Sequence, residues 1–123
     1  MILKNILYKI ASSNAEEKSF NLELVPECLM YRAHFPEHPI TPGVCIIQIA
    51  SELLNELLQS DFELITVSNA KFLAVINPLE TNSVIYTFKK VVVDEDTKTV
   101  KVSVIVSNPE TIFTKLSLVY KKQ

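Results

Sequence analysis

The chain has 123 residues, of which 48% are hydrophobic and 21% are charged, and its formal net charge is −2. These values are typical of a folded globular protein, and they exclude a disordered chain and a strongly basic surface for nucleic acid. The two cysteines have neither the spacing of metal ligands nor the number expected of a disulfide framework, so we expect no metal site and no disulfide framework.

Two strands are predicted in the N-terminal part of the chain, at residues 2–11 and 18–26. The N-terminal segment is too short and too interrupted by Lys4, Asn5 and Lys9 to be a signal peptide. No run in the sequence approaches the roughly 18 apolar residues of a membrane span. We therefore expect a cytoplasmic protein that has no membrane partner.

One long helix is predicted over residues 43–59. Its first half, GVCIIQIA, is apolar almost all round, which predicts a helix buried on most of its sides. Pro42 and Gly43 suit the start of a helix, where the missing N–H of proline costs little. The apolar residues that fit helical spacing are Val44, Ile47, Leu54 and Leu58.

Gly43 is the only glycine of the chain, whereas an average protein of this length has about eight or nine. This scarcity excludes sites built on glycine-rich loops, such as the dinucleotide-binding fingerprint and the P-loop. We expect that the one glycine present occupies a position where a Cβ atom cannot be tolerated.

Four strands are expected after the helix, at residues 64–76, 83–93, 98–106 and 111–120. The last three alternate in hydrophobicity and are rich in β-branched or aromatic residues, as half-buried strands are. Short turns of Asp, Asn and Pro connect them and predict an antiparallel meander. The side chains expected on its inner face are Val84, Tyr86, Phe88, Val100, Val102, Val104, Val106, Ile112, Leu116, Leu118 and Tyr120.

These elements predict an α+β fold in which one antiparallel sheet wraps around one buried helix, as a single domain over residues 1–123. The segment that carries chemistry is 34–48, HFPEHPITPGVCIIQ. Its three prolines stiffen a loop that carries His34, and the following helix start exposes unsatisfied backbone N–H groups at the positive end of the helix dipole. A base beside such donors suits removal of a proton next to a carbonyl group.

This segment resembles the signature of the (3R)-hydroxyacyl-acyl-carrier-protein dehydratases of the hot-dog fold, H-F-P-G-x-P-x-x-P-G-V-x-x-x-E. The positions in register are His34, Phe35, Pro36, Pro39, Pro42, Gly43 and Val44. A softer match covers residues 69–72 and 75–78, with Phe72 at the end of an Asn-Ala-Lys-Phe strand segment. The resemblance implies a hot-dog fold and a homodimer or higher oligomer, in which one subunit supplies the histidine and the other the acid.

By this resemblance, His34 removes the α-proton of a 3-hydroxyacyl thioester and the N–H of Gly43 holds the thioester carbonyl. The substrate is carried by acyl carrier protein or coenzyme A, in fatty acid or related lipid synthesis, and no cofactor is implied. The substrate-binding positions are Phe35, Pro42, Val44 and Phe72, although both phenylalanines also suit an ordinary core.

The sequence departs from the family signature at two positions. Glu37 replaces the first glycine, and Gln48 replaces the catalytic acid, so position 48 holds an amide that has no carboxyl proton to give. Three functions stay open: a dehydratase in which His34 makes both proton transfers, a thioester hydrolase, and an acyl-binding or partner subunit without turnover. Gln48 also suits the start of an ordinary polar stripe with Glu52 and Asn55.

Overall fold

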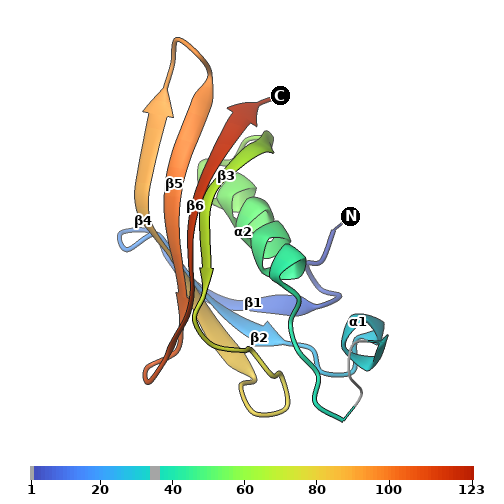
Figure 1. Ribbon diagram of the computed structural model, residues 1–123. Coiled ribbons are helices and arrows are strands. Elements are labelled where there is room, and N and C mark those ends of the chain that lie inside the picture. The colour runs from blue at the N-terminus through green and yellow to red at the C-terminus, as the bar shows by residue number, and fades with distance from the viewer. Residues whose placement is uncertain (1, 34–36) are drawn as a thin grey trace.

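The computed structural model describes residues 2–33 and 37–123. In this part of the chain, six antiparallel strands form one curved sheet, and a long helix lies against its concave side (Figure 1). The sheet order is β1-β2-β4-β5-β6-β3. The strands are β1 (Tyr8–Asn14), β2 (Ser19–Leu24), β3 (Phe62–Phe72), β4 (Ser83–Asp94), β5 (Thr99–Ser107) and β6 (Ile112–Lys122); the helices are α1 (Leu29–Ala33) and α2 (Gly43–Leu58).

The last three strands form the antiparallel meander that the sequence predicts, and the side chains expected on its inner face are buried with one exception. The prediction is wrong for Ile112, which is 45% exposed. The pairing of β5 with β6 shifts by one residue between Val106 and Ser107, the residue opposite Ile112. Such a shift moves a side chain to the other face of the sheet, and it places the neighbouring Phe113 in the core.

The N-terminal segment differs from the strand predicted over residues 2–11, because β1 begins only at Tyr8. Residues before it form turns and one isolated bridge, from which Leu3 and Leu7 are nevertheless buried. The helix α1 was not predicted at all. Its five residues are too few to display a helical repeat in the sequence.

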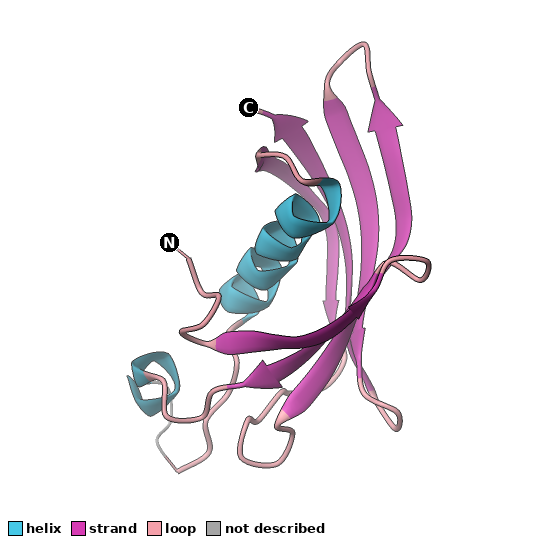
Figure 2. Ribbon diagram, turned by 180° about the vertical axis from the view of Figure 1, so that it is seen from behind, coloured by secondary structure: helices cyan, strands magenta, loops and turns pink. Residues whose placement is uncertain are grey.

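Strand β3 lies at one edge of the sheet and pairs there with β6 (Figure 2). It ends at Phe72, so the last four residues of the predicted strand 64–76 lie beyond it. Its hydrophobic side chains Ile65 and Val67 are 50% and 43% exposed. A long edge strand that exposes hydrophobic side chains is a template on which a further strand can pair.

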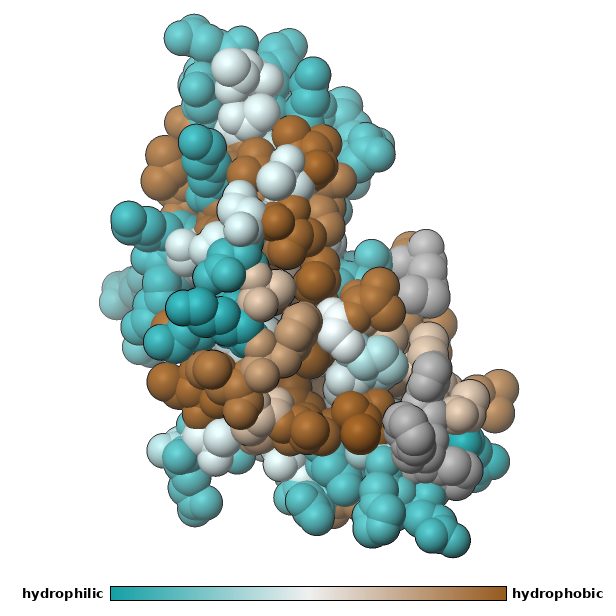
Figure 3. Space-filling view, in the orientation of Figure 1, coloured by the Kyte–Doolittle hydropathy of each residue, from teal (hydrophilic) through white to brown (hydrophobic). Residues whose placement is uncertain are grey.

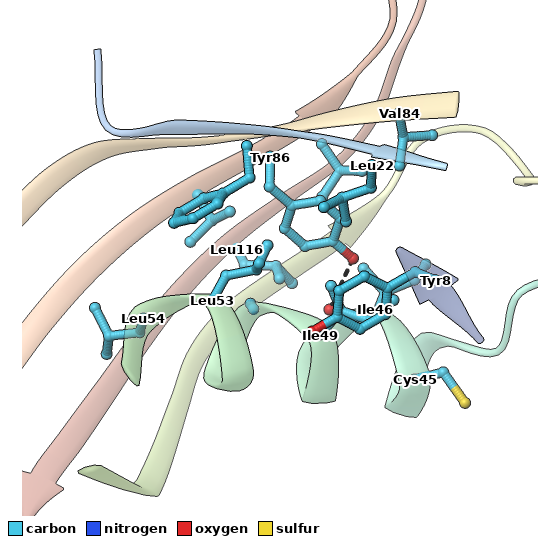
Figure 4. Packing of buried hydrophobic residues seen from close by; sticks show 14 of the residues in the cluster. Tyr8, Leu22, Cys45, Ile46, Ile49, Leu53, Leu54, Val84, Tyr86 and Leu116 are labelled. Carbon is cyan, nitrogen blue, oxygen red and sulfur yellow. Dashed lines mark hydrogen bonds between the residues drawn. The ribbon is translucent and has the colours of Figure 1, made fainter. Parts of the chain in front are cut away.

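Helix α2 buries one face against the sheet and leaves the opposite face open. Figure 4 shows the core between α2 and the strands, where the hydroxyl of Tyr86 donates to the backbone carbonyl of Ile46 at 3.0 Å. The expectation of a helix buried on most sides is therefore wrong for the outer face, on which Val44 is 70% exposed. A single sheet covers only one side of a helix. The buried residues of α2 are Cys45, Ile46, Ile49, Ala50, Leu53 and Leu54.

Candidate active site

The predicted base His34 and its neighbour Phe35 lie outside the described residues, but the chain on both sides of them is fixed. The buried hydroxyls of Tyr31, on α1, and Thr41 share a hydrogen bond of 2.8 Å. The backbone N–H of Thr41 donates to the carbonyl of Ile76 at 2.9 Å. The segment between α1 and α2 is thus held at its two ends. Apart from the three prolines, no sequence pattern predicts these hydrogen bonds.

Helix α2 begins at Gly43, as predicted, and Pro42 is its half-buried N-cap residue in an extended conformation. Proline supplies no side-chain hydrogen bond to cap the helix. The first backbone bonds of the helix run from Cys45 and Ile46 to the carbonyl of Pro42. Within residues 2–33 and 37–123, the N–H groups of Gly43 and Val44 have no hydrogen-bond partner, so they are available to an oxygen atom of a ligand.

The side chain of Phe72, at the end of β3, explains why residue 43 is a glycine. A Cβ atom at Gly43 would lie 2.8 Å from Cζ of Phe72 and 3.2 Å from its Cε1. Gly43 does not have a positive φ, so it is the absence of a side chain, and not a special backbone conformation, that this position requires. The structure therefore brings together two of the predicted site residues, Gly43 and Phe72, from elements far apart in the sequence.

Gln48 lies one turn into α2 on the outer face, and its side chain is held by Glu52. The amide Nε2 of Gln48 donates to Oε2 of Glu52 at 2.9 Å. The same carboxylate also accepts hydrogen bonds from the backbone N–H groups of Leu3 and Lys4 and from the hydroxyl of Tyr8. Burial, and then the neighbouring charge of Glu52, raise the pKa of Tyr8 well above its ordinary value. The sequence placed Glu52 only in a possible polar stripe, and no local pattern links it to the N-terminus.

A groove of about 400 Å³ runs along the outer face of α2 beside the first residues of β3. Val44 and Gln48, both predicted site residues, line it together with Ile47, Ser51, Glu52 and Leu64. Figure 3 shows hydrophobic side chains running down the face on which α2 and β3 lie. The groove has a mixed lining, to which Asn55, Asp61, Phe62, Glu63 and Gln123 also contribute. Its apolar side chains, Val44, Ile47, Phe62 and Leu64, are the part of the lining that suits an acyl chain.

The other reactive side chains near the helix start do not have the surroundings of catalytic groups. Cys45 is 1% exposed, and burial raises the pKa of its thiol, which disfavours the nucleophilic thiolate. His38 and Glu37 are exposed. Among the described residues, no group of three or more His, Cys, Asp or Glu side chains is arranged to hold a metal ion, and no helix is long and apolar enough to cross a membrane.

Residues 11–108 match the family model of the ApeI-like proteins, described as ApeI dehydratase. The chain belongs to the ApeI-like dehydratase family. This membership confirms a hot-dog dehydratase family, as the sequence motif indicated. A search of curated proteins found no match.

Solved structures with the same fold include two proteins named for related chemistry. The ApeI:P dehydratase heterocomplex from Xenorhabdus doucetiae is 19% identical with a TM-score of 0.64, and the match covers 85% of this chain and 86% of that chain. The (R)-hydratase from A. caviae involved in PHA biosynthesis is 16% identical with a TM-score of 0.55, over 82% of this chain and 74% of that chain. At these identities the likeness establishes the fold, and the predicted hot-dog fold is confirmed.

Proposed function

We propose that this protein eliminates water from a 3-hydroxyacyl thioester and forms a trans-2-enoyl thioester. The observation that carries the proposal is the match of residues 11–108 to the ApeI dehydratase family. The thioester is carried by acyl carrier protein or coenzyme A, and the reaction belongs to fatty acid or related lipid synthesis. The elimination is redox-neutral and transfers only protons and a hydroxyl group.

In this proposal His34 removes the proton from C2, next to the thioester carbonyl. The negative charge that develops on the carbonyl oxygen is stabilised by the N–H of Gly43 and by the dipole of α2. When the carbonyl re-forms, the electron pair makes the C2–C3 double bond and the C3–O bond breaks. His34 returns its proton to the departing hydroxyl, which leaves as water. Gln48 does not act as the acid, because an amide has no carboxyl proton to donate, and its role is to orient that hydroxyl.

The acyl chain follows the surface between α2 and the end of β3. Phe72 covers Gly43, and Val44 opens onto the groove along the helix. We propose that Phe35, Pro42, Val44 and Phe72 contact the substrate. Pro42 and Val44 flank Gly43 in the sequence, Phe72 lies against Gly43 in space, and Phe35 follows the proposed base His34.

The site is proposed to be completed by a second copy of the chain. Strand β3 is an edge strand that exposes hydrophobic side chains, and the outer face of α2 is open beside it. Pairing of two β3 strands would join the two sheets. Size-exclusion chromatography with light scattering tests this: a monomer at micromolar concentration would contradict the shared site.

A specific observation favours two other functions. The amide of Gln48 can hold a water molecule against a thioester as readily as a hydroxyl group, which suits hydrolysis. The same substitution suits a subunit that binds acyl groups without turnover and relies on a different dimer partner for its acid. Both functions use the same groove and the same helix start.

The test offers 3-hydroxyacyl and saturated acyl thioesters of several lengths to the purified protein and follows enoyl formation and thiol release in parallel. For the dehydratase, we expect enoyl product and a loss of about 10²–10⁴-fold in rate in the variant His34→Ala. His38→Ala is the matched control, because that histidine is exposed and lies in the same loop.

Each outcome separates the three functions. Thiol release without enoyl product would establish the hydrolase and overturn the dehydratase. Acyl-thioester binding with neither product would establish the binding subunit. An equal loss of activity in both histidine variants would show that the loop, and not the imidazole of His34, is what the reaction requires.

A further inference from the structure

We propose that Glu52 is a positioning residue that fixes the amide of Gln48 with its oxygen, Oε1, turned toward the substrate. The inference rests on the proposed dehydratase function and extends it to the recognition of the 3-hydroxyl group. It assigns a role to a residue outside the motif, one helical turn beyond the position of the family's acid.

The carboxylate of Glu52 is surrounded by hydrogen-bond donors. Its Oε2 accepts from the backbone N–H of Leu3 at 2.8 Å and from Nε2 of Gln48 at 2.9 Å. Its Oε1 accepts from the backbone N–H of Lys4 at 2.8 Å and from the hydroxyl of Tyr8 at 2.9 Å. Each carboxylate oxygen thus receives one backbone and one side-chain hydrogen bond, and the four donors come from the N-terminal segment, β1 and α2.

This arrangement dictates which end of the Gln48 amide faces Glu52. A backbone N–H can only donate, so both oxygens of Glu52 are acceptors. An amide can satisfy an acceptor only through its NH₂ group, so Nε2 of Gln48 must point toward Glu52. The planar amide then places Oε1 on the side away from Glu52, where it can accept a hydrogen bond but cannot give one.

A fixed acceptor has a direct consequence for the substrate. A 3-hydroxyl group can donate its hydrogen to Oε1 of Gln48, and this turns a lone pair of the hydroxyl oxygen toward the proton that His34 returns. A 3-oxo group has no hydrogen to donate, and a saturated chain has no oxygen at this position. Gln48 held by Glu52 therefore selects 3-hydroxyacyl groups over 3-oxoacyl groups by donor chemistry, and a site of this kind can discriminate strongly.

The first experiment measures the orientation of the amide without any reaction. The side-chain ¹H–¹⁵N resonances of Gln48 are assigned as the pair that is lost from the spectrum of the variant Gln48→Asn. They are then compared between the unmodified protein and Glu52→Gln. We expect the Gln48 NH₂ resonances of the unmodified protein to shift when Glu52→Gln removes the charged acceptor. Tyr8→Phe is the matched control: it removes another partner of Glu52 and leaves the bond to Gln48 in place. Unchanged Gln48 resonances in folded Glu52→Gln would overturn the proposal.

The second experiment measures the consequence for turnover. We expect Glu52→Gln to lower kcat for a 3-hydroxyacyl thioester by about 10²-fold, with little change in KM, because a misplaced orienting group acts in the transition state. Tyr8→Phe should stay within about 3-fold, since only the far side of the carboxylate loses a bond. The 3-oxoacyl analogue should inhibit the unmodified protein weakly and Glu52→Gln equally or better.

The outcomes for the two proposals are distinguishable. If the unmodified protein forms no enoyl product, the dehydratase proposal fails, while the resonances of Gln48 still decide whether Glu52 orients it. If the dehydratase is active and Glu52→Gln is folded with an unchanged kcat, the positioning role is wrong. If Glu52→Gln does not fold, Glu52→Asp keeps the charge but moves the carboxylate away on a shorter side chain. A shift of the Gln48 NH₂ resonances in Glu52→Asp supports the role, and unchanged resonances overturn it.

Discussion

The two faces of α2 differ in what holds them and in what they can do. The inner face is apolar and its side chains are packed beneath the sheet, with Leu53 and Leu54 fully buried. The outer face carries Gln48 and Glu52, which contact the N-terminal segment and the groove. Residues that stabilise the fold and residues proposed to act on the substrate therefore lie on opposite faces of α2. Substitutions on the inner face should change mainly the free energy of unfolding, and substitutions on the outer face mainly the activity.

Both faces contain hydrogen bonds from tyrosines, and these also differ. From the sheet, Tyr86 donates to a backbone carbonyl of α2, and Tyr120 shares a bond of 2.8 Å with Ser51, which also lines the groove. On the outer side, Tyr8 donates to the carboxylate of Glu52. Tyr86 and Tyr120 link the helix to strands of the meander, whereas Tyr8 links it to β1.

The largest effect is expected from truncation on the inner face. Leu53→Ala removes a fully buried side chain, and we expect it to lower the free energy of unfolding by about 2–5 kcal/mol. Val44→Ala is the matched control on the outer face, because its side chain is 70% exposed, and it should change stability by less than about 0.5 kcal/mol. Urea unfolding at one protein concentration measures both.

The comparison fails if Val44→Ala costs as much as Leu53→Ala. That result would place Val44 in a buried contact between subunits, and the loss should then depend on protein concentration, whereas the effect of Leu53→Ala should not.

Much of the inner face could be predicted from the sequence because its pattern is local. Alternation in residues 98–106 places all four valines on one face, and each of them is buried. The start of α2 at Gly43 was predicted from the proline–glycine pair and is confirmed. The prediction was wrong at Ile112, where a one-residue shift in pairing depends on the neighbouring strand and not on the sequence around that residue.

The outer face could not be predicted in the same way. The hydrogen bonds from Leu3 and Lys4 to Glu52 join residues that lie 49 and 48 positions apart in the sequence. No periodic pattern in the sequence predicts contacts over such a separation. The scarcity of glycine was informative for a reason that only the structure gives. Within the described ranges 2–33 and 37–123, four non-glycine residues adopt positive φ, among them Gln59 at 51° and Lys98 at 57°, so glycine is not reserved here for left-handed backbone. It is kept where Phe72 leaves no space for a side chain.

A substitution on the outer face should change activity more than stability. Gln48→Glu restores the family's acid, and we expect the dehydration rate to rise by about 10- to 100-fold. The new carboxyl group would replace the amide that lies 2.9 Å from Oε2 of Glu52. Two carboxyl groups at this distance repel each other when both are ionised, which favours the protonated form of the new acid. Enoyl formation, measured from pH 5 to 9, tests both points.

The sign of the pH effect follows from this repulsion. Ionisation of both carboxyl groups would bring two like charges together only in the folded chain, so the stability of Gln48→Glu should decrease as the pH rises. An unchanged rate at every pH would show that position 48 does not limit the reaction.

High pH should destabilise the core around Tyr120. Burial raises the pKa of Tyr120 to about 12 from an ordinary value of 10.0. Because the folded chain disfavours the ionised phenol, this contribution to stability is complete below pH 10 and is lost as the pH rises toward 12, by at most about 1.4 kcal/mol per pH unit. Tyr120→Phe should be less stable than the unmodified protein at pH 8, but its stability should fall less steeply between pH 10 and 12.

The smallest effect is expected at the solvent end of the outer face. Glu56 lies four residues after Glu52, and its carboxylate accepts a hydrogen bond from the Nζ of Lys4 at 2.7 Å; both side chains are about 40% exposed. The hydrogen bond and charge of Lys4 hold the pKa of Glu56 below its ordinary value of 4.5. A lowered pKa adds stability above the unfolded value and loses it as the pH falls through the folded one. Glu56→Gln should cost less than about 1 kcal/mol at pH 7 and nothing at pH 3 or in 1 M salt. Glu52→Gln should lower the free energy of unfolding by more than Glu56→Gln at pH 7, at pH 3 and in 1 M salt. Two of the groups that donate to Glu52 are the backbone N–H groups of Leu3 and Lys4, which neither protonation nor salt removes.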